Sequence, residues 1–212
     1  EADSISIINI LNDTAYLQSK GFDMYNKVSV FIPNTYEIWW NTSAQQLFDK
    51  MYKEYTAFWN SNRLSKAKEL KLTPNQIITL ASIVEQETSK NDEKPKVAGV
   101  YLNRLKSNMA LQADPTLIFA AGDFSIRRVL NYHKEIESPY NTYKYTGLPP
   151  GPICIPAISS IDAVLNPDKH NYVFFCAKED FSGYHNFALS YNEHLINARK
   201  YQAALNRRKI MK

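Results

Sequence analysis

Residues 72–88 read LTPNQIITLASIVEQET, a strong helix start followed by a nearly unbroken apolar run. Thr73 suits the N-cap, Pro74 suits the first helical position, and Gln76 completes a capping box. One face of the helix then carries Ile77, Leu80, Ala81, Val84 and Thr88. The stretch therefore predicts a buried helix whose last turn holds two glutamates.

Further helices and one hairpin are expected on either side of this segment. Ser43 and Gln46 form a capping box ahead of apolar residues at helical spacing up to Trp59. A helix is expected to begin between Asp92 and Pro95 and to run to Leu105, and another over residues 190–206. The runs 172–176 and 184–188 flank a turn at Gly183, which is typical of a hairpin. These elements predict an α+β fold.

A polar, basic stretch over residues 61–71 shows no apolar period and is expected to be a linker or domain edge. This divides the chain into a small, mostly helical N-terminal subdomain (1–70) and a larger domain (71–212). Residues 107–157 are rich in Pro, Gly, Tyr and Asn. Because so long an irregular stretch is unusual in a compact domain, we expect it to be functional.

Composition excludes several classes of protein. The 212 residues are 44% hydrophobic with a net charge of +4, which excludes overall disorder and gives no indication of nucleic-acid binding. Two cysteines cannot form a disulfide scaffold, and no apolar run reaches the length of a membrane span. The four histidines lack metal-ligand spacing, so neither a metal nor a cofactor is expected. Since the chain starts at Glu1 without a methionine, we expect a portion of a longer protein.

The candidate chemistry lies in the two carboxylates near the end of the 73–88 helix. On a helical wheel Glu87 and Glu85 fall on opposite edges of the apolar stripe, and the wheel does not choose between them. Both can be solvated surface residues. Alternatively, one of them is held against apolar walls, where desolvation raises its pKa and allows it to donate a proton near neutral pH.

Arg104 lies beside the apolar stripe of the next helix, so we expect it to be buried. A buried guanidinium needs a polar partner, and Asp114 is the first candidate, with Glu87 the second. The pair is either structural or positions a residue at the edge of a cleft.

Several blocks of sequence, in order, resemble the endolytic murein transglycosylases of the MltG (YceG-like) family. They are ASIVEQET (81–88), VAGVYLNRL (97–105), LQADPT (111–116), YNTY (140–143) and GLPPGPI (147–153). FIPNTY (31–36) resembles the segment ahead of the family's catalytic region, and His185-Asn186-Phe187 fits its end. The resemblance covers about residues 30–205.

The resemblance implies a lysozyme-like helical catalytic centre in which Glu87, the second glutamate, is the catalytic residue. The substrate-binding residues expected with it are Arg104, Gln112, Asp114, Tyr140, Asn141, Tyr143, Leu148 and Pro149. Tyr140, Asn141 and Tyr143 are expected to line the same cleft as Glu87, with residues 147–152 shaping its rim.

The family implies a bacterial enzyme that cleaves peptidoglycan glycan strands internally between MurNAc and GlcNAc, without water, leaving 1,6-anhydro-MurNAc ends. It also implies an inner-membrane anchor not visible in this chain, a catalytic domain on the outer side, and possible contact with cell-wall synthases. Internal transglycosylation needs one group that serves as acid and then as base, not the two carboxylates of ordinary glycosidases. A non-catalytic peptidoglycan-binding module and a hydrolytic muramidase are the alternatives.

Overall fold

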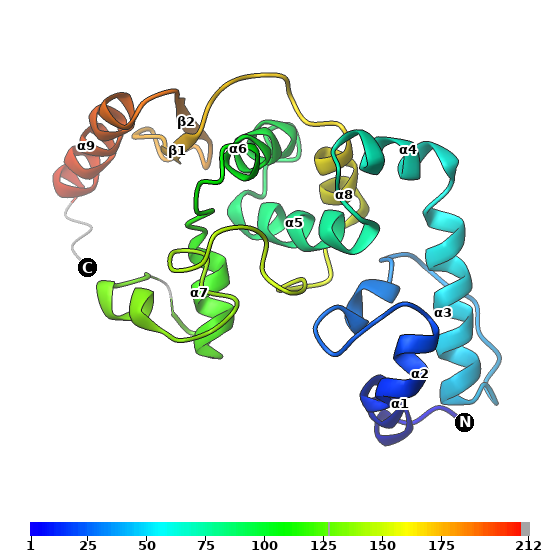
Figure 1. The fold of residues 1–212 in the computed structure, drawn as a ribbon. Coiled ribbons are helices and arrows are strands. Elements are labelled where there is room, and N and C mark those ends of the chain that lie inside the picture. Colours follow the sequence, from blue (N-terminus) through cyan, green and yellow to red (C-terminus); the bar gives the residue numbers. More distant parts are fainter. Residues whose placement is uncertain (127, 209–212) are drawn as a thin grey trace.

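The computed structural model describes residues 1–126 and 128–208, which form helices and one two-stranded sheet (Figure 1). This confirms the predicted α+β class. The described elements are, in order, α1 (Ser4–Asn12), α2 (Thr14–Ser19), η1 (Lys27–Val30), α3 (Ala44–Phe58), α4 (Ser61–Glu69), α5 (Pro74–Glu87), α6 (Lys94–Lys106), α7 (Asp114–Ala121), η2 (Asn131–Glu135), α8 (Ile158–Leu165), β1 (Phe174–Ala177), β2 (His185–Ala188) and α9 (Tyr191–Arg207).

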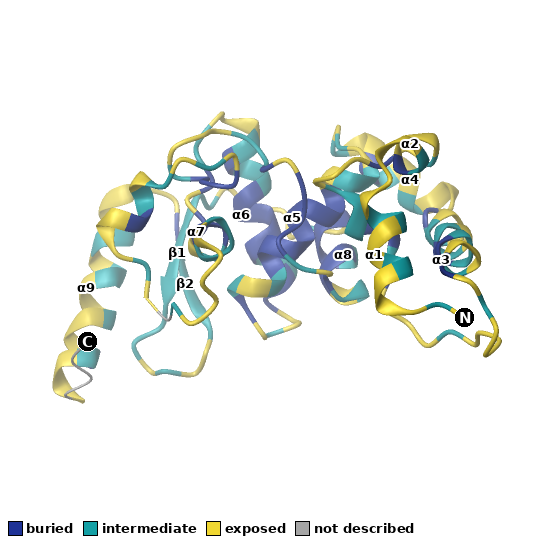
Figure 2. Cartoon of the chain, turned by 90° about the horizontal axis from the view of Figure 1, so that it is seen from below, coloured by how far each residue is buried: buried dark blue, intermediate teal, exposed yellow. Residues whose placement is uncertain are grey.

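The central helix α5 is the one predicted from residues 73–88. Thr73 and Gln76 form the expected capping box, with Pro74 in the first turn. Every residue from Ile77 to Val84 is buried, and α4, α6, α7 and α8 all contact the helix. Figure 2 shows α5 as the most continuous buried element. A helix that is apolar on nearly all sides has to be covered by other elements on all sides.

The helix α6 packs beside α5 and approaches the loop before the hairpin very closely at Gly99. A Cβ atom built on Gly99 would lie 2.6 Å from Nε2 of His170, so only glycine fits. The helix α8 completes the layer against α5 and α6. Because α8 is short and follows a Pro-rich stretch, the sequence did not indicate it.

The predicted hairpin is present as the antiparallel pair β1 and β2, in which Phe175 lies opposite Phe187. Asn103 of α6 holds the segment before β1 in place, because its side-chain amide donates hydrogen bonds to the carbonyl oxygens of His170 and Tyr172. Glu93 fixes β2 to the start of α6, because its Oε2 lies 2.7 Å from Nδ1 of His185 and its Oε1 accepts a hydrogen bond from the His185 amide. The helix α9 then packs against the hairpin.

The N-terminal residues form a second apolar cluster around Leu17, Phe22, Val30, Phe48 and Met51. Most of it is contributed by α2, η1 and α3, with the predicted Ser43 capping box at the start of α3. This cluster contains none of the pocket residues described below.

The stretch 61–71, expected to be a linker or domain edge, contains the helix α4 over residues 61–69. Asn60 caps α4, Ala67 is buried in the main core, and Arg63 forms a 3.2 Å ion pair with Asp162 of α8. Tertiary contacts therefore stabilise this helix in the absence of an apolar period. The division of the chain near residue 70 stays a prediction.

Candidate active site

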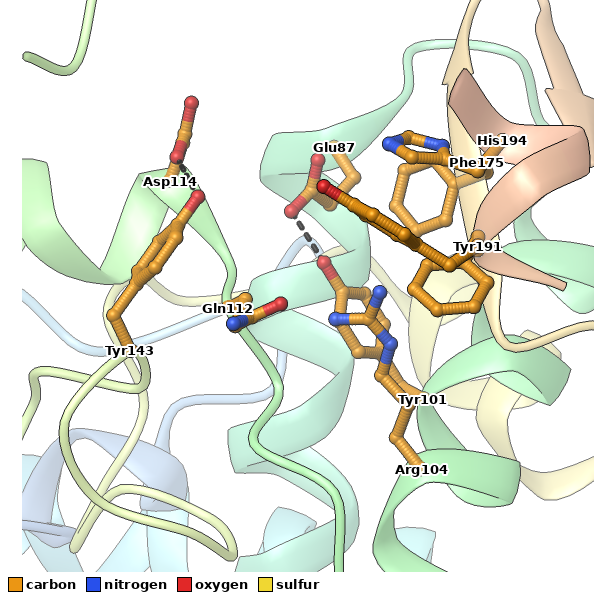
Figure 3. A pocket seen from close by; sticks show the side chains of 10 residues that line it. Glu87, Tyr101, Arg104, Gln112, Asp114, Tyr143, Phe175, Tyr191 and His194 are labelled. Carbon is orange, nitrogen blue, oxygen red and sulfur yellow. Dashed lines mark hydrogen bonds between the residues drawn. The ribbon is translucent and has the colours of Figure 1, made fainter. Parts of the chain in front are cut away.

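Glu87 is the last residue of α5 and lines a pocket of about 270 Å³ (Figure 3). The other walls come from α6, from the segment 112–114, from the loop after η2 and from the hairpin with α9. The remaining lining residues are Tyr101, Arg104, Gln112, Asp114, Tyr143, Phe174, Phe175, Tyr191 and His194.

Among the described residues, one donor bonds to the carboxyl group of Glu87, the hydroxyl of Tyr101, at 2.5 Å from Oε1. The pKa of Glu87 is raised to about 7, mainly by burial and to a smaller extent by the negative charge of Asp114, against the hydrogen bond from Tyr101 and the charge of Arg104. A substantial fraction of Glu87 is therefore protonated at neutral pH, as a general acid requires.

Glu85 lies in a different environment, facing α8 and α6. It forms a 3.1 Å ion pair with the buried Lys94, and the hydroxyl of Ser160 donates a hydrogen bond to it. Burial works to raise the pKa of Glu85, but the bonds from Ser160 and Lys94 outweigh burial and lower it. The structure thus separates the two glutamates that the helical wheel left equivalent: Glu85 is an ionised structural partner, and Glu87 is a protonatable group in a pocket.

Arg104 is buried, as expected, but its expected ion pair is absent. No carboxylate of the described residues, neither Asp114 nor Glu87, lies within 4.0 Å of its guanidinium. Instead, Nε donates to the carbonyl oxygen of Val173 at 2.7 Å and Nη1 to that of Leu111 at 2.5 Å. The physical reason is that the backbone at these two positions has carbonyl groups without partners in regular structure, and a buried guanidinium satisfies both.

Gln112 and Asp114 reach the pocket because residues 111–114 alternate between buried and exposed positions. Leu111 and Ala113 are buried, whereas Gln112 and Asp114 are exposed. Gln112 adopts a positive φ of 50°. The hydroxyl of Tyr143 donates to Oδ1 of Asp114 at 2.5 Å and so joins the following loop to this segment.

Thr142 connects the same two segments through its backbone and side chain. Its carbonyl oxygen accepts from the amide of Gln112, and its Oγ1 accepts from the amide of Ala113, each at 3.0 Å. The Oγ1 atom also lies 2.8 Å from that of Thr116. These buried bonds hold Tyr143 in register with Asp114.

Tyr140 and Asn141 do not line the pocket with Glu87, and this part of the expectation is corrected. Asn141 is fully buried, where its amide donates to the carbonyls of Lys134 and Ile136 and its Oδ1 accepts from the amide of Tyr143. The ring of Tyr140 packs on Phe119, with centroids 4.6 Å apart. Both side chains therefore shape the loop from within.

Leu148 and Pro149 also lie outside the pocket lining, as does the block 147–152 that was expected to form its rim. Leu148 packs against the main core, and Pro149 is buried. The amide of Ile153 donates to Oγ of Ser82 in the middle of α5. Proline and glycine let this segment run closely along the central helix, which accounts for its composition.

The lining residues that sequence reasoning did not assign to a site are Tyr101, Phe174, Phe175, Tyr191 and His194. Tyr101 was read as part of an apolar stripe, and its ring is indeed buried, but its hydroxyl reaches Glu87. The others come from the hairpin, which contacts α6, and from α9, which packs against the hairpin, so only the tertiary fold brings them to the pocket. No local pattern marks them. Among residues 1–126 and 128–208, no cluster of three or more His, Cys, Asp or Glu side chains could hold a metal ion.

Comparison with known proteins gives a consistent result. A model of the YceG-like family matches residues 3–200. A crystal structure of a YceG-like protein from Listeria monocytogenes superposes with a TM-score of 0.76 at 28% sequence identity, covering 92% of this chain and 67% of that chain.

Curated relatives of this chain carry the name endolytic murein transglycosylase. The protein of Bacillus subtilis (strain 168) is 39% identical over 166 residues, which is 78% of this chain and 45% of the relative. The protein of Streptococcus pneumoniae serotype 2 is 32% identical over 161 residues, or 72% of this chain and 28% of the relative. The chain thus spans less than half the length of these relatives.

Proposed function

Because this chain belongs to the YceG-like family, we propose that it is an endolytic lytic transglycosylase that cleaves peptidoglycan glycan strands. The observation that carries the proposal is the environment of Glu87, one carboxyl group with a pKa of about 7 in a pocket walled by aromatic and polar side chains. The names of the relatives give the substrate class, a murein strand cut internally.

The proposed reaction uses Glu87 twice. Its carboxylic acid first transfers the proton to the glycosidic oxygen between MurNAc and GlcNAc, and the bond from that oxygen to C1 of MurNAc breaks. The N-acetyl group of the same sugar stabilises the electron-poor C1. The carboxylate of Glu87 then removes the proton from the C6 hydroxyl, whose oxygen bonds to C1. The product is a 1,6-anhydro ring, water is not consumed, and Glu87 regains its proton.

The remaining lining residues act on this carboxyl or on the substrate. Tyr101 holds the Glu87 carboxyl in one orientation through its hydrogen bond. Gln112, Asp114 and Tyr143 supply polar groups on one wall, and Arg104 supplies the nearby positive charge. We assign Tyr140, Asn141, Leu148 and Pro149 to the support of these walls, since each is packed away from the pocket.

Hydrolysis to a reducing end is the second candidate, and the position of Asp114 favours it. Asp114 lines the same pocket as Glu87, and hydrolytic glycosidases use two carboxylates. In that reaction the second carboxylate would activate water. A binding module without catalysis is the third candidate and has no use for a protonated Glu87.

The test is mass spectrometry of the ends formed when the protein digests purified, uncrosslinked glycan strands. Anhydro ends are lighter by one water than reducing ends, so the two reactions give different masses from the same cut. We expect internal cuts with anhydro ends. Reducing ends alone would establish the hydrolytic reaction, and intact strands would leave only the binding module.

The site of action is also part of the proposal. From the family resemblance we place the domain on the outer side of the bacterial inner membrane, where an anchor outside these residues and contact with cell-wall synthases would keep it near new strands. In the described part of the chain, no helix combines the length and hydropathy needed to cross a bilayer.

A further inference from the structure

The polar side chains of the pocket differ in whether the protein itself satisfies them. Glu87 is bonded to Tyr101, Asp114 is bonded to Tyr143, and the guanidinium of Arg104 is bonded to backbone carbonyls. The side chains of Gln112, Tyr191 and His194 have no hydrogen-bond partner among residues 1–126 and 128–208. Two of these three residues, Tyr191 and His194, belong to α9.

His194 is held by ring contacts alone. Its imidazole stacks on Phe174, with centroids 5.4 Å apart and planes 26° from parallel, and lies 6.2 Å from the ring of Tyr191. Its Nδ1 is buried without a partner, so Nε2 is the only ring nitrogen that a ligand can meet. Burial, together with the charge of Arg104, lowers the pKa of His194 and keeps the ring neutral at physiological pH.

Tyr191 is the first residue of α9, and 60% of it is exposed although it lines the pocket. Figure 3 shows Tyr191 and His194 on one side of Glu87, with Asp114 and Tyr143 on the other side. A large exposed aromatic ring at a pocket mouth offers a flat apolar surface. The catalytic carboxyl therefore lies between a polar wall and an aromatic wall.

We propose that Tyr191 and His194 form a sugar subsite on the α9 wall of the pocket. The ring of Tyr191 stacks on the C–H face of an N-acetylhexosamine unit next to the scissile bond, and Nε2 of His194 hydrogen-bonds to a hydroxyl or acetamido group of the same unit. This inference rests on the proposed function and identifies which wall recognises the strand.

The chemistry of the wall fits an uncharged sugar better than a charged ligand. The wall consists of an imidazole, a phenol and the ring of Phe174, which adds a third aromatic surface. A pyranose ring presents an apolar face and a rim of hydroxyl groups, and these match a stacking surface beside one free nitrogen. Binding also supplies a hydrogen-bond partner for Nε2 of His194, which has none among the described residues of the free protein.

The experiment measures the contribution of the Tyr191 ring to binding separately from that of the polar atoms of Tyr191 and His194. Steady-state cleavage of purified glycan strands is measured for Tyr191→Ala, Tyr191→Phe, His194→Ala, His194→Gln and His194→Asn. The alanine variants should raise KM by about three- to tenfold, the effect of one lost hydrogen bond or stacked ring, with kcat changed much less. Tyr191→Phe keeps the stacking surface and should restore most of the affinity.

The two amide variants of His194 identify the nitrogen involved. A Gln side chain places its amide near the position of Nε2, and an Asn side chain places it near Nδ1. We expect His194→Gln to restore binding and His194→Asn to resemble the alanine variant. Tyr132→Ala removes an equally exposed ring outside the pocket lining and serves as the matched control.

A binding measurement keeps the inference separate from catalysis. Titration of a soluble N-acetylglucosamine hexamer into Glu87→Gln, with and without Tyr191→Ala or His194→Ala, should show weaker binding in the double variants. Unchanged affinity and unchanged KM in folded Tyr191 and His194 variants would overturn the subsite and leave the proposed function intact. Full cleavage activity in Glu87→Gln would instead overturn the proposed function.

Discussion

The hydroxyl of Tyr101 on α6 donates a 2.5 Å hydrogen bond to Oε1 of Glu87 at the end of α5. The bond joins the two most deeply packed helices at the point where they meet the pocket. It stabilises the ionised form of Glu87, while burial of the same carboxyl disfavours that form, and burial has the larger effect. The pKa near neutrality is the result of these opposing influences.

Replacing Glu87 with Gln should leave the fold intact and lower the cleavage rate by at least about 10²–10⁴-fold, because an amide cannot donate and then accept a proton. The measurement is anhydro-product formation on purified strands. Glu85→Gln is the matched control on the same helix. It should keep most of the activity but lose about 1–3 kcal/mol of stability, because Lys94 is left buried without a charged partner.

If Glu85→Gln abolished cleavage and Glu87→Gln did not, the assignment of the two glutamates would be reversed.

The same Glu87→Gln variant should be more stable than the wild type at pH 8. A carboxyl whose pKa rises on folding contributes fully to stability below its unfolded pKa and loses that contribution as the pH rises through the folded pKa. For Glu87 this window runs from 4.5 to about 7. The gain at pH 8 should be up to about 3 kcal/mol, measured by urea unfolding at pH 4, 6 and 8.

Glu85→Gln should show the opposite trend, since the pKa of Glu85 is lowered in the fold and its contribution is present above the unfolded pKa. Parallel stability curves for wild type and Glu87→Gln across this range would contradict the raised pKa.

Tyr101→Phe should move the alkaline limb of the pH–rate profile to higher pH. The phenyl ring fills the same buried space, but the hydrogen bond that favours ionised Glu87 is lost, so the pKa of Glu87 rises further. We also expect kcat to fall by about tenfold, because the carboxyl is no longer held in one orientation. Tyr143→Phe, which loses a bond to Asp114, should leave that limb closer to its wild-type position. A limb that moves to lower pH in Tyr101→Phe would exclude this role.

Arg104→Met should destabilise the protein by about 2–4 kcal/mol, because it leaves the carbonyl groups of Val173 and Leu111 without donors. It should also raise the pKa of Glu87, which the charge of Arg104 lowers. Hydrogen exchange at β1 and at residues 110–112 would report the local loss. Protection unchanged at both places would show that Arg104 does not hold them together.

Gly151→Ala should destabilise the contact between the 147–152 block and the N-terminal residues by about 2–3 kcal/mol. A Cβ atom at this position would lie 2.0 Å from the carbonyl oxygen of Tyr25, so the backbone has to move. Gly147→Ala is the control, since a Cβ there meets open space and only the positive φ of 88° is strained, at about 1 kcal/mol. Equal losses in the two variants, compared by denaturant titration, would refute the close contact.

The sequence was most informative where one element carries its own signal. The caps of α5 and α3 and the two β-type runs are local patterns, and each is present in the structure. By contrast, α4 has no apolar period that would indicate a helix. It is stabilised by tertiary contacts, such as the ion pair of Arg63 with Asp162, which lies far away in the sequence. Burial of Arg104 was predictable, but its hydrogen-bond partners were not. They are backbone carbonyl groups, which every residue has and which no sequence pattern marks.

The site shows the same limit. Burial makes Tyr101 look like a core residue, so the sequence gives no sign that its one polar atom faces Glu87. Asn141 and Tyr140 stand in a motif beside Tyr143, yet only Tyr143 reaches the pocket, because the neighbouring side chains turn inward to hold the loop. Tyr191 and His194 belong to a helix whose position beside the pocket depends on the whole hairpin.

The order of the pocket walls along the chain also bears on when, during synthesis, the Glu87 carboxyl becomes buried. Glu87 precedes Phe174, Phe175, Tyr191 and His194 in the chain, so it is synthesised before this wall of the pocket. Without the hairpin and α9 one wall of the pocket is missing, and freer access of water to the carboxyl favours its ionised form. The C-terminal wall thus contributes to the burial that keeps Glu87 protonated near neutral pH.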